Sequence, residues 1–401
     1  MDTILTQTIW QIMEELRDAN QLEKALSGTL DILRNAVGCE EGAIWMTDDQ
    51  SGRLIAVMSA GQTDYTGISV RTGEGIIGKV TDSGEPLIIN DLAAYGEYLA
   101  GEDSLESIPD NVLVVPLRTP IHSIGCMMLA NKPGGFTEDD SKLCANSCAI
   151  VALDIEDKGF EFRPFEDRDP IISVRNVIKE FQNGEEVSRI LKGVDLDVYP
   201  GELMVVLGES GCGKSTLINI IGGMDKMTSG KLMVEGKDMS APSESELTEY
   251  RREYIGFIFQ AYNLMPNLSA YENVEFIGEI SRNPMDSMEA LRLVGLDSKA
   301  DNMPAALSGG QMQRVSIARA LVKDPKVILA DEPTAALDYE TSIKVLNVVE
   351  TIVRERKTTV IMVTHNPEIA KMANRVIKLR GGKISSIRVN LHPLRAEELV
   401  W

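Results

Sequence analysis

The chain has 401 residues, enough for two or three domains, and its 43% hydrophobic and 25% charged residues exclude a disordered or collagen-like protein. With 61 acidic and 40 basic residues the net charge is −21, which disfavours nucleic acid as a partner. Five irregularly spaced cysteines argue against a disulfide framework and for a reducing compartment. The sequence shows neither a signal peptide nor an apolar run of transmembrane length, so we expect it not to cross a membrane by itself.

The first 158 residues have the charge and the pattern of one small domain. They hold 26 acidic and 10 basic residues, a net charge of −16, whereas residues 159–401 have a net charge of −5. Apolar residues recur at helical spacing from Ile9 to Leu16, including Ile12 and Met13, which predicts one helix over 3–36. The later elements are expected to be strands at 42–48, 53–60, 111–117 and 124–131 and a helix at 136–157 with Thr137 as its N-cap.

A second domain follows a short connection. The stretch 157–170 is charged, lacks periodicity and contains two prolines, so we place a linker at 159–169. Beyond it, strand-like and helical segments alternate, which predicts an α/β domain with a largely parallel sheet at 170–390. Residues 391–401 are expected to form a tail that docks either on this domain or on a partner.

The segment GESGCGKST matches the phosphate-binding P-loop pattern and lies between an apolar strand and an apolar helix. Its glycines let backbone N–H groups turn around phosphate oxygens, and the N-terminus of the following helix adds a positive dipole. Lys214 is expected to reach the β- and γ-phosphates, and Ser215 to place its hydroxyl on Mg²⁺. The candidate nucleotide-binding residues are Gly208, Glu209, Ser210, Gly211, Cys212, Gly213, Lys214, Ser215 and Thr216.

The segment VILADEP (327–333) is predicted to be an apolar strand that ends in two carboxylates. Asp331 stands where a carboxylate beside a P-loop holds Mg²⁺, and Glu332 is placed to polarise an attacking water. An ordinary acid pair at a strand end is the alternative, and the nearby P-loop disfavours it.

Four further segments resemble motifs of ATP-binding cassette (ABC) ATPases. They are FQAYNL (259–264), LSGGQMQR (307–314), TAALD (334–338) and VTHN (363–366), similar to the Q-loop, the signature, the D-loop and the switch-histidine region. With the P-loop and the acid pair, all six motifs occur in the family's order. The resemblance covers about 170–390 and implies a P-loop NTPase fold that binds and hydrolyses ATP.

The resemblance also implies roles for single residues. Phe181 would stack on adenine, and Gln260 would contact Mg²⁺ or water and sense a transmembrane partner. The catalytic set would be Glu332, His365 and Gln260, and the metal set Ser215, Gln260 and Asp331. The signature residues, which would bind ATP held by the opposite subunit of a homodimer, are Leu307, Ser308, Gly309, Gly310 and Gln311, and Asp338 is the D-loop acid. Because no member of the catalytic set is replaced, we expect a competent ATPase.

The amino-acid sequences of the segments 220–230 and 255–276 resemble those of the lipoprotein-release and macrolide-export branch of the family. That branch pairs an ATPase with a separate membrane permease, so we expect a cytoplasmic subunit held peripherally at the membrane by a permease. A soluble ATP-dependent signalling protein that acts without a permease is the alternative.

Residues 1–158 resemble a GAF domain, a small-ligand sensor fold with an antiparallel sheet and flanking helices. The resemblance rests on the segments 42–48, 73–80, 85–92, 112–119 and 124–140. It implies regulation of the ATPase by a small molecule, and a dimerisation module without a ligand remains the alternative. Lys132 and Asp140 are expected to form a structural contact, and no cyclic nucleotide is inferred because Ser141 stands where that type of GAF domain has Glu.

Two features of this region leave alternatives open. The cysteines Cys39, Cys126, Cys144 and Cys148 either pack in the core or form a metal or redox site. The aromatic residue Trp10 on the first helix either covers the sheet or makes a dimer contact.

Overall fold

The computed structural model divides the chain into two compact units. The first unit comprises Met1–Asp167 with Ser385–Leu391, and the second comprises Arg168–Ile384 with His392–Trp401. The described residues are 2–18, 22–48, 52–97, 108–120, 122–158, 169–183, 186–390 and 393–401. The linker expected at 159–169 therefore lies outside the described residues except at Asp169. Within these ranges, no helix is both long enough and apolar enough to cross a membrane.

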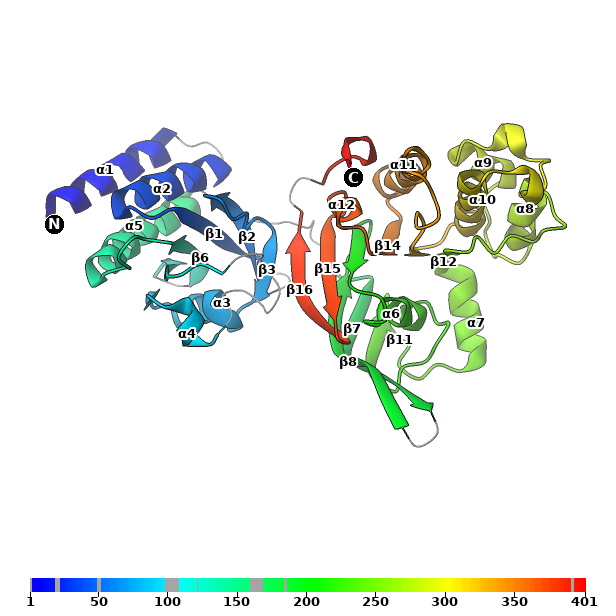
Figure 1. The fold of residues 1–401 in the computed structure, drawn as a ribbon, viewed down its shortest axis with the longest axis horizontal. Helices are drawn as coiled ribbons and strands as arrows, with labels where there is room; N and C mark the ends of the chain where they lie inside the picture. The colour runs from blue at the N-terminus through cyan, green and yellow to red at the C-terminus, as the bar shows by residue number, and fades with distance from the viewer. Residues whose placement is uncertain are drawn as a thin grey trace. The chain divides into compact units, whose positions relative to one another are not determined.

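The first unit is built on an antiparallel sheet with the strand order β3-β2-β1-β6-β5-β4 (Figure 1). The strands are β1 (Glu41–Asp48), β2 (Arg53–Ala60), β3 (Ile68–Arg71), β4 (Leu87–Ile89), β5 (Val112–Arg118) and β6 (Ser123–Ala130). Successive side chains of a strand point to opposite faces, so Ile44 and Met46 join one core and Ala43 and Trp45 the other. Both faces therefore need a covering layer of helices.

The helices divide between the two faces of this sheet. On one face α1, α2 and α5 bury residues such as Ile12, Leu30 and Val151, and on the other α3 and α4 bury Ile77 and Leu92. The helices are α1 (Asp2–Asp18), α2 (Leu22–Val37), α3 (Gly75–Ser83), α4 (Leu92–Tyr95) and α5 (Glu138–Asp157). Thr137 is the N-cap of α5, as expected, and forms a capping box with Asp140.

The prediction of a single helix over 3–36 is wrong, because α1 and α2 are separate helices that pack against each other. One helix of that length would extend about 50 Å. Ile12 of α1 and Leu30 of α2 instead lie in the same core over one sheet. Met13 and Trp10, placed on or near the apolar stripe from the sequence, are 55% and 61% exposed, so Trp10 does not cover the sheet.

The second unit contains a parallel sheet with the strand order β12-β13-β14-β9-β15. This confirms the predicted α/β fold. The strands are β9 (Leu203–Leu207), β12 (Ile255–Ile258), β13 (Val327–Asp331), β14 (Thr359–Thr364) and β15 (Arg375–Arg380).

Four strands of this unit form a separate antiparallel sheet with the order β11-β10-β7-β8 instead of joining the parallel one. Its strands are β7 (Ile172–Asn183), β8 (Glu186–Val198), β10 (Ser229–Val234) and β11 (Lys237–Asp238). β7 and β8 pair along nearly their whole length, which a sequence pattern of separate strands does not reveal.

Helices surround the parallel sheet, and α8, α9 and α10 gather in a group of their own (Figure 1). The helices are α6 (Lys214–Ile221), α7 (Glu244–Glu253), α8 (Ala270–Glu279), α9 (Ser287–Leu293), α10 (Gly309–Leu321), α11 (Tyr339–Arg356) and α12 (Pro367–Ala370), with short 3₁₀ turns at Asp297–Lys299, Pro304–Ala306 and Ala396–Glu398.

One strand, β16 (Lys383–Val389), is shared between the two units. Its residues from Ser385 onward group with the first unit, where Ile387 pairs with Ser69 of β3. The sequence pattern placed these residues in the domain at 170–390.

Candidate functional site

Three loops meet at one edge of the parallel sheet because they follow adjacent strands. β14 pairs with β9 on one side and with β13 on the other, so Thr364 lies opposite Leu207 and Val363 lies opposite Asp331. The P-loop follows β9, Glu332 follows β13 and His365 follows β14. The carboxyl ends of neighbouring parallel strands are a usual place for a ligand site.

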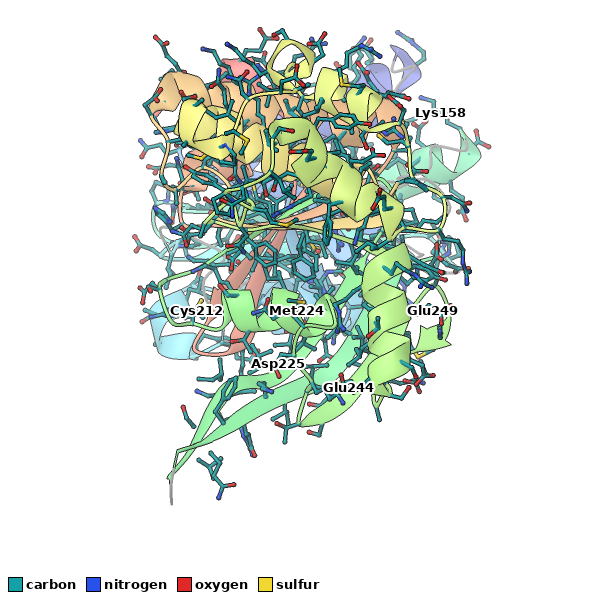
Figure 2. The ribbon with its side chains drawn as sticks, turned by 90° about the vertical axis from the view of Figure 1, so that its right-hand side faces the viewer. Lys158, Cys212, Met224, Asp225, Glu244 and Glu249 are labelled. Atoms are coloured by element: carbon teal, nitrogen blue, oxygen red, sulfur yellow. The ribbon has the colours of Figure 1, made fainter. Side chains whose placement is uncertain are left out.

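The P-loop turns sharply into α6. Gly213 is the N-cap of α6 and has a φ of +109°, a conformation that a residue with a Cβ rarely adopts. Lys214 is buried, and its Nζ donates to the carbonyl oxygens of Gly208 (2.7 Å) and Glu209 (2.9 Å). Cys212 is partly exposed in this loop, just before α6 (Figure 2). The P-loop therefore holds the ammonium group of Lys214, which is expected to bind phosphate together with the N–H groups of the same loop.

Ser215 and Asp331 connect the P-loop to the end of β13. Ser215 Oγ donates to Asp331 Oδ1 over 3.3 Å. Burial raises the pKa of the Asp331 carboxyl above its ordinary value, and the neighbouring Glu332 adds to the shift. A hydroxyl and a carboxylate therefore converge at the mouth of the loop.

Glu332 stands in a strained backbone conformation beside His365. Its φ of +46° lies in the left-handed region, which costs a residue with a Cβ about 1–2 kcal/mol. Its N–H donates to the carbonyl of Val363 over 3.0 Å, which fixes the turn, and its Oε2 lies 2.9 Å from Nδ1 of His365. Two residues predicted to act together are thus in direct contact.

The predicted Q-loop contacts both ends of α10. Gln260 is exposed, and Tyr262 and Asn263 both have positive φ. Arg319 of α10 donates to the carbonyl oxygens of Tyr262 (2.9 Å) and Asn263. A Cβ placed on Gly309 would stand 3.0 Å from the Tyr262 hydroxyl, so the two loops are in van der Waals range.

The predicted signature forms the N-terminus of α10. Ser308 is its N-cap and makes a capping box with Gln311, in which Ser308 N donates to Gln311 Oε1 (2.9 Å) and Gln311 N to Ser308 Oγ (3.3 Å). Leu307 and Gly310 are buried, whereas Ser308 is exposed. The helix therefore presents a capped but solvent-facing N-terminus.

The D-loop residue Asp338 caps α11 and contacts the signature through a residue that the sequence patterns did not single out. Its carboxylate accepts from the N–H (3.0 Å) and the hydroxyl (2.8 Å) of Thr341. A Cβ on Gly310 would stand only 2.0 Å from Thr341 Cγ2. The spacing Asp338-x-x-Thr341 is a helix-cap signal that predicts the cap but not the contact with α10.

Phe181, predicted to stack on adenine, lies on β7 and is 40% exposed. The ammonium of Lys179 lies 4.7 Å from the centre of its ring. Lys179 also pairs with Asp225 over 2.6 Å, which holds the cation beside the ring. The role of Lys179 was not predicted, although its position two residues before Phe181 places both on the same face of a strand.

The cysteines of the first unit are core residues. Cys39, Cys126, Cys144 and Cys148 are all buried, and burial raises the pKa of Cys39 to about 11 and of Cys126 to about 12. Among the residues that the structure describes, no group of three or more His, Cys, Asp or Glu could hold a metal ion. These thiols therefore lack the features of a metal or redox site.

Two other features of the first unit are polar. Lys132 Nζ lies 2.5 Å from Asp140 Oδ2, the structural contact expected between the last strand and the last helix.

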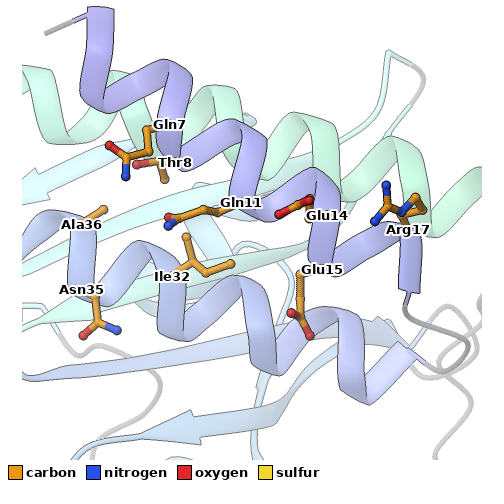
Figure 3. A pocket seen from close by; sticks show the side chains of 9 residues that line it. All are labelled: Gln7, Thr8, Gln11, Glu14, Glu15, Arg17, Ile32, Asn35 and Ala36. Atoms are coloured by element: carbon orange, nitrogen blue, oxygen red, sulfur yellow. The ribbon is translucent and has the colours of Figure 1, made fainter.

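A groove of about 750 Å³ lies between α1 and α2, with Gln11, Glu14 and Asn35 in its lining (Figure 3).

Comparisons with known proteins found relatives of both units. The model of the ABC transporter family matches residues 191–335, and that of the GAF domain matches residues 19–155. A solved dimeric structure, the ATP-binding cassette MJ0796 in a post-hydrolysis state bound to ADP and Pi, is 39% identical with a TM-score of 0.51, and the match covers 55% of this chain and 98% of that one.

Curated relatives match a little more than half of this chain. The putative ABC transporter ATP-binding protein MG065 homolog of Mycoplasma pneumoniae is 44% identical over 238 residues, 59% of this chain and 51% of that protein. The macrolide export ATP-binding/permease protein MacB of Escherichia coli is 44% identical over 220 residues, 54% of this chain and 34% of that protein. The chain thus spans about half the length of the first relative and a third of the second. Its second unit belongs to the ATP-binding cassettes of the ABC transporter family and is related to MG065 and MacB, and a GAF domain precedes it.

Proposed function

We propose that the chain is the ATP-binding and ATP-hydrolysing subunit of an ABC transporter, powers a separate membrane permease and is regulated through its GAF domain. The observation that carries the proposal is the convergence of Lys214, the Ser215–Asp331 pair and the Glu332–His365 pair at the ends of three adjacent strands.

ATP would bind with its phosphates in the P-loop. Lys214 would exchange its two carbonyl acceptors for phosphate oxygens, a charge-assisted interaction. The exposed part of Phe181 offers a ring face for adenine, while Lys179 lies over the ring. The N-terminus of α6 adds a positive dipole at the phosphates.

The oxygen donors around the P-loop suit Mg²⁺. The hydroxyl of Ser215 and the carboxylate of Asp331 already face each other, and we propose that the amide of the exposed Gln260 would supply a third oxygen of the hard type that Mg²⁺ prefers. When bound, Mg²⁺ would neutralise charge that develops on the phosphate oxygens during transfer.

Glu332 would act as the general base for hydrolysis. Glu332 follows β13 at the edge of the sheet where the P-loop lies, and His365 contacts its carboxylate. The carboxylate would orient the attacking water and accept its proton, while His365 contacts the γ-phosphate. Glu332 and His365 follow two different strands, β13 and β14, and the parallel pairing of these strands brings both residues to the same edge of the sheet.

The signature would complete the site of a second copy. Ser308 is exposed at the N-terminus of α10, a helix of sufficient length to carry a dipole toward an anion. The similarity to MJ0796, whose solved structure is a dimer bound to ADP and Pi, supports a head-to-tail homodimer with two composite ATP sites.

The permease partner rests on similarity alone. The cassette matches part of an ATP-binding/permease protein, and we propose that here the permease is a separate chain that holds this subunit at the cytoplasmic face of the membrane. A soluble signalling protein that uses the GAF domain as its output is the rival function, since the chain does carry a GAF domain.

Co-expression with the permease encoded nearest to it tests the function and its rival together. The chain should sediment with membranes only when the permease is present, and the complex should hydrolyse ATP. Glu332→Gln should lower turnover at least about a hundredfold and preserve ATP binding, because it removes only the base. Glu355→Gln, an exposed glutamate of α11, is the matched control and should leave turnover unchanged. Undiminished turnover in Glu332→Gln would contradict the proposed mechanism. Sedimentation that does not depend on the permease would favour a soluble signalling protein.

A further inference from the structure

The segment 393–401, which we name the strap, packs on the helices of the second unit to which it belongs. Ala396 and Leu399 are fully buried in the same core cluster as Leu346 of α11 and Met372 just beyond α12. The sequence pattern left open whether this part of the chain docks on the domain or on a partner. The structure places it on the ATPase domain.

The strap holds the first residue of α11 by two contacts. The hydroxyl of Tyr339 donates to the carbonyl of Leu399 over 2.7 Å. The rings of Tyr339 and Trp401 meet edge to face, with centroids 5.0 Å apart. Tyr339 directly follows Asp338, so both contacts act on the residue next to the D-loop acid.

The strap also holds α12. The N–H of Leu394 donates to the carbonyl of Lys371, directly after α12, over 3.0 Å. The N–H of Ala396 donates to Glu350 on the middle of α11 over 2.8 Å. Because α12 begins just beyond His365, the strap connects the two helices that follow the D-loop and the switch histidine.

A chain of contacts runs from the strap to the signature. Tyr339 begins α11, Asp338 caps it by binding Thr341, and the methyl group of Thr341 packs on Gly310. A shift of the start of α11 would therefore move both the D-loop and the surface against which α10 is seated. Such packed contacts transmit displacement because they leave no free space.

We propose that Tyr339 and Trp401 are positioning residues: they hold the D-loop in register with the signature and so set the geometry of the ATP site shared between two subunits. The inference rests on the proposed function as an ATPase dimer. Both residues are exposed by more than 40%, so neither is a core residue, and the buried part of each ring lies in the contact between the strap and α11. We expect their main role to be fixing the position of the start of α11.

The test compares Trp401→Ala with Trp401→Phe, Tyr339→Phe and Val400→Ala in the full chain. Trp401→Ala and Tyr339→Phe should each lower kcat about fivefold, the effect of losing one modest contact, and leave KM for ATP within about twofold. Trp401→Phe keeps an aromatic edge and should recover most of the lost turnover. Val400 is 75% exposed and adjacent, so Val400→Ala is the matched control and should change nothing.

Hydrogen exchange gives a readout that does not depend on turnover. Trp401→Ala should speed amide exchange over 337–342, at the D-loop and the start of α11, and leave exchange in α6 unchanged. Unaltered exchange at 337–342 would overturn the positioning role, as would a parallel loss of kcat, ATP affinity and thermal stability, which indicates general unfolding. A wild-type chain that binds ATP without turnover would overturn the proposed function instead, and exchange alone would then decide whether the strap holds the D-loop.

Discussion

Each unit contains a carboxylate joined to other side chains, and the two carboxylates differ in what surrounds them. In the first unit, Glu41 is buried and accepts from the hydroxyls of Tyr65 (2.7 Å) and Thr63 (3.0 Å), both from the same unit. In the second, Glu332 shares its carboxylate with His365, whose side chain is 65% exposed. The closed cluster, Glu41 with Tyr65 and Thr63, stabilises the fold. The exposed pair, Glu332 with His365, has acceptor and donor capacity left for a ligand.

Thiol reactivity should separate the two units most strongly. Cys212 is partly exposed in the P-loop, whereas Cys126, Cys144 and Cys148 are fully buried with raised pKa values. We expect iodoacetamide to modify Cys212 about a hundredfold faster than these three, because they react only after local opening. Mass spectrometry of the native chain measures the ratio, and saturating ATP should slow the labelling of Cys212. Equal rates at all four sites would show that the first unit is not closed.

Removing the P-loop ammonium should give the next largest effect. Lys214→Ala should weaken ATP binding by about ten- to a hundredfold, the usual worth of a charge-assisted hydrogen bond to phosphate. Fluorescence titration with a nucleotide analogue measures it. Lys226→Ala, which removes an exposed lysine of the same unit, should bind ATP normally. An unchanged affinity in Lys214→Ala would place the phosphates elsewhere.

The closed cluster should affect stability and spare the ATPase. Tyr65→Phe keeps the ring against Trp45 and removes the hydroxyl that Glu41 accepts, leaving a buried carboxylate with one donor fewer. The first unit should lose about 1–3 kcal/mol of unfolding free energy in urea. Tyr95→Phe, at an exposed tyrosine of α4, is the control. A change of kcat without a change of stability would mean that the cluster takes part in function.

The smallest effect is an acid dependence of the first unit. Burial opposes ionisation of Asp140, but hydrogen bonds from Lys132 and Thr137 outweigh it and hold its pKa below the ordinary value. The ionised carboxylate therefore stabilises the fold above the unfolded pKa of about 3.9, and that stability is lost as the pH falls through the folded pKa. Lys132→Met should cost about 1 kcal/mol at pH 7 and flatten the pH dependence below pH 4, measured by thermal unfolding. The exposed Lys142→Met should keep the wild-type profile.

The sequence was sufficient for features carried by contiguous residues. The segment from Gly208 to Thr216 specifies its own turn, because glycines and a helix start act locally. The order of strand and helix predicted the parallel sheet, and parallel pairing then brings Asp331 and His365 to one edge.

Features that depend on distant residues could not be predicted. The contact of Thr341 with Gly310 joins two helices, and no local pattern records it. The same is true of the strap, where Leu399 and Trp401 reach Tyr339 sixty or more positions earlier. The prediction of one helix over 3–36 was wrong for a related reason. Two separate helices can bury Ile12 and Leu30 in the same core, and this tertiary packing is not recorded in the local helical pattern.

Mixing two inactive variants tests the composite ATP site most directly. Lys214→Ala disables the P-loop, and Gly309→Asp places a carboxylate at the signature, so each homodimer should be inactive. Randomly mixed protomers form half heterodimers, each with one intact site of two, so turnover should recover to at most about a quarter of the wild-type rate. No recovery from two folded variants that both dimerise, or wild-type turnover by Gly309→Asp alone, would contradict a site built from the P-loop of one subunit and the signature of another.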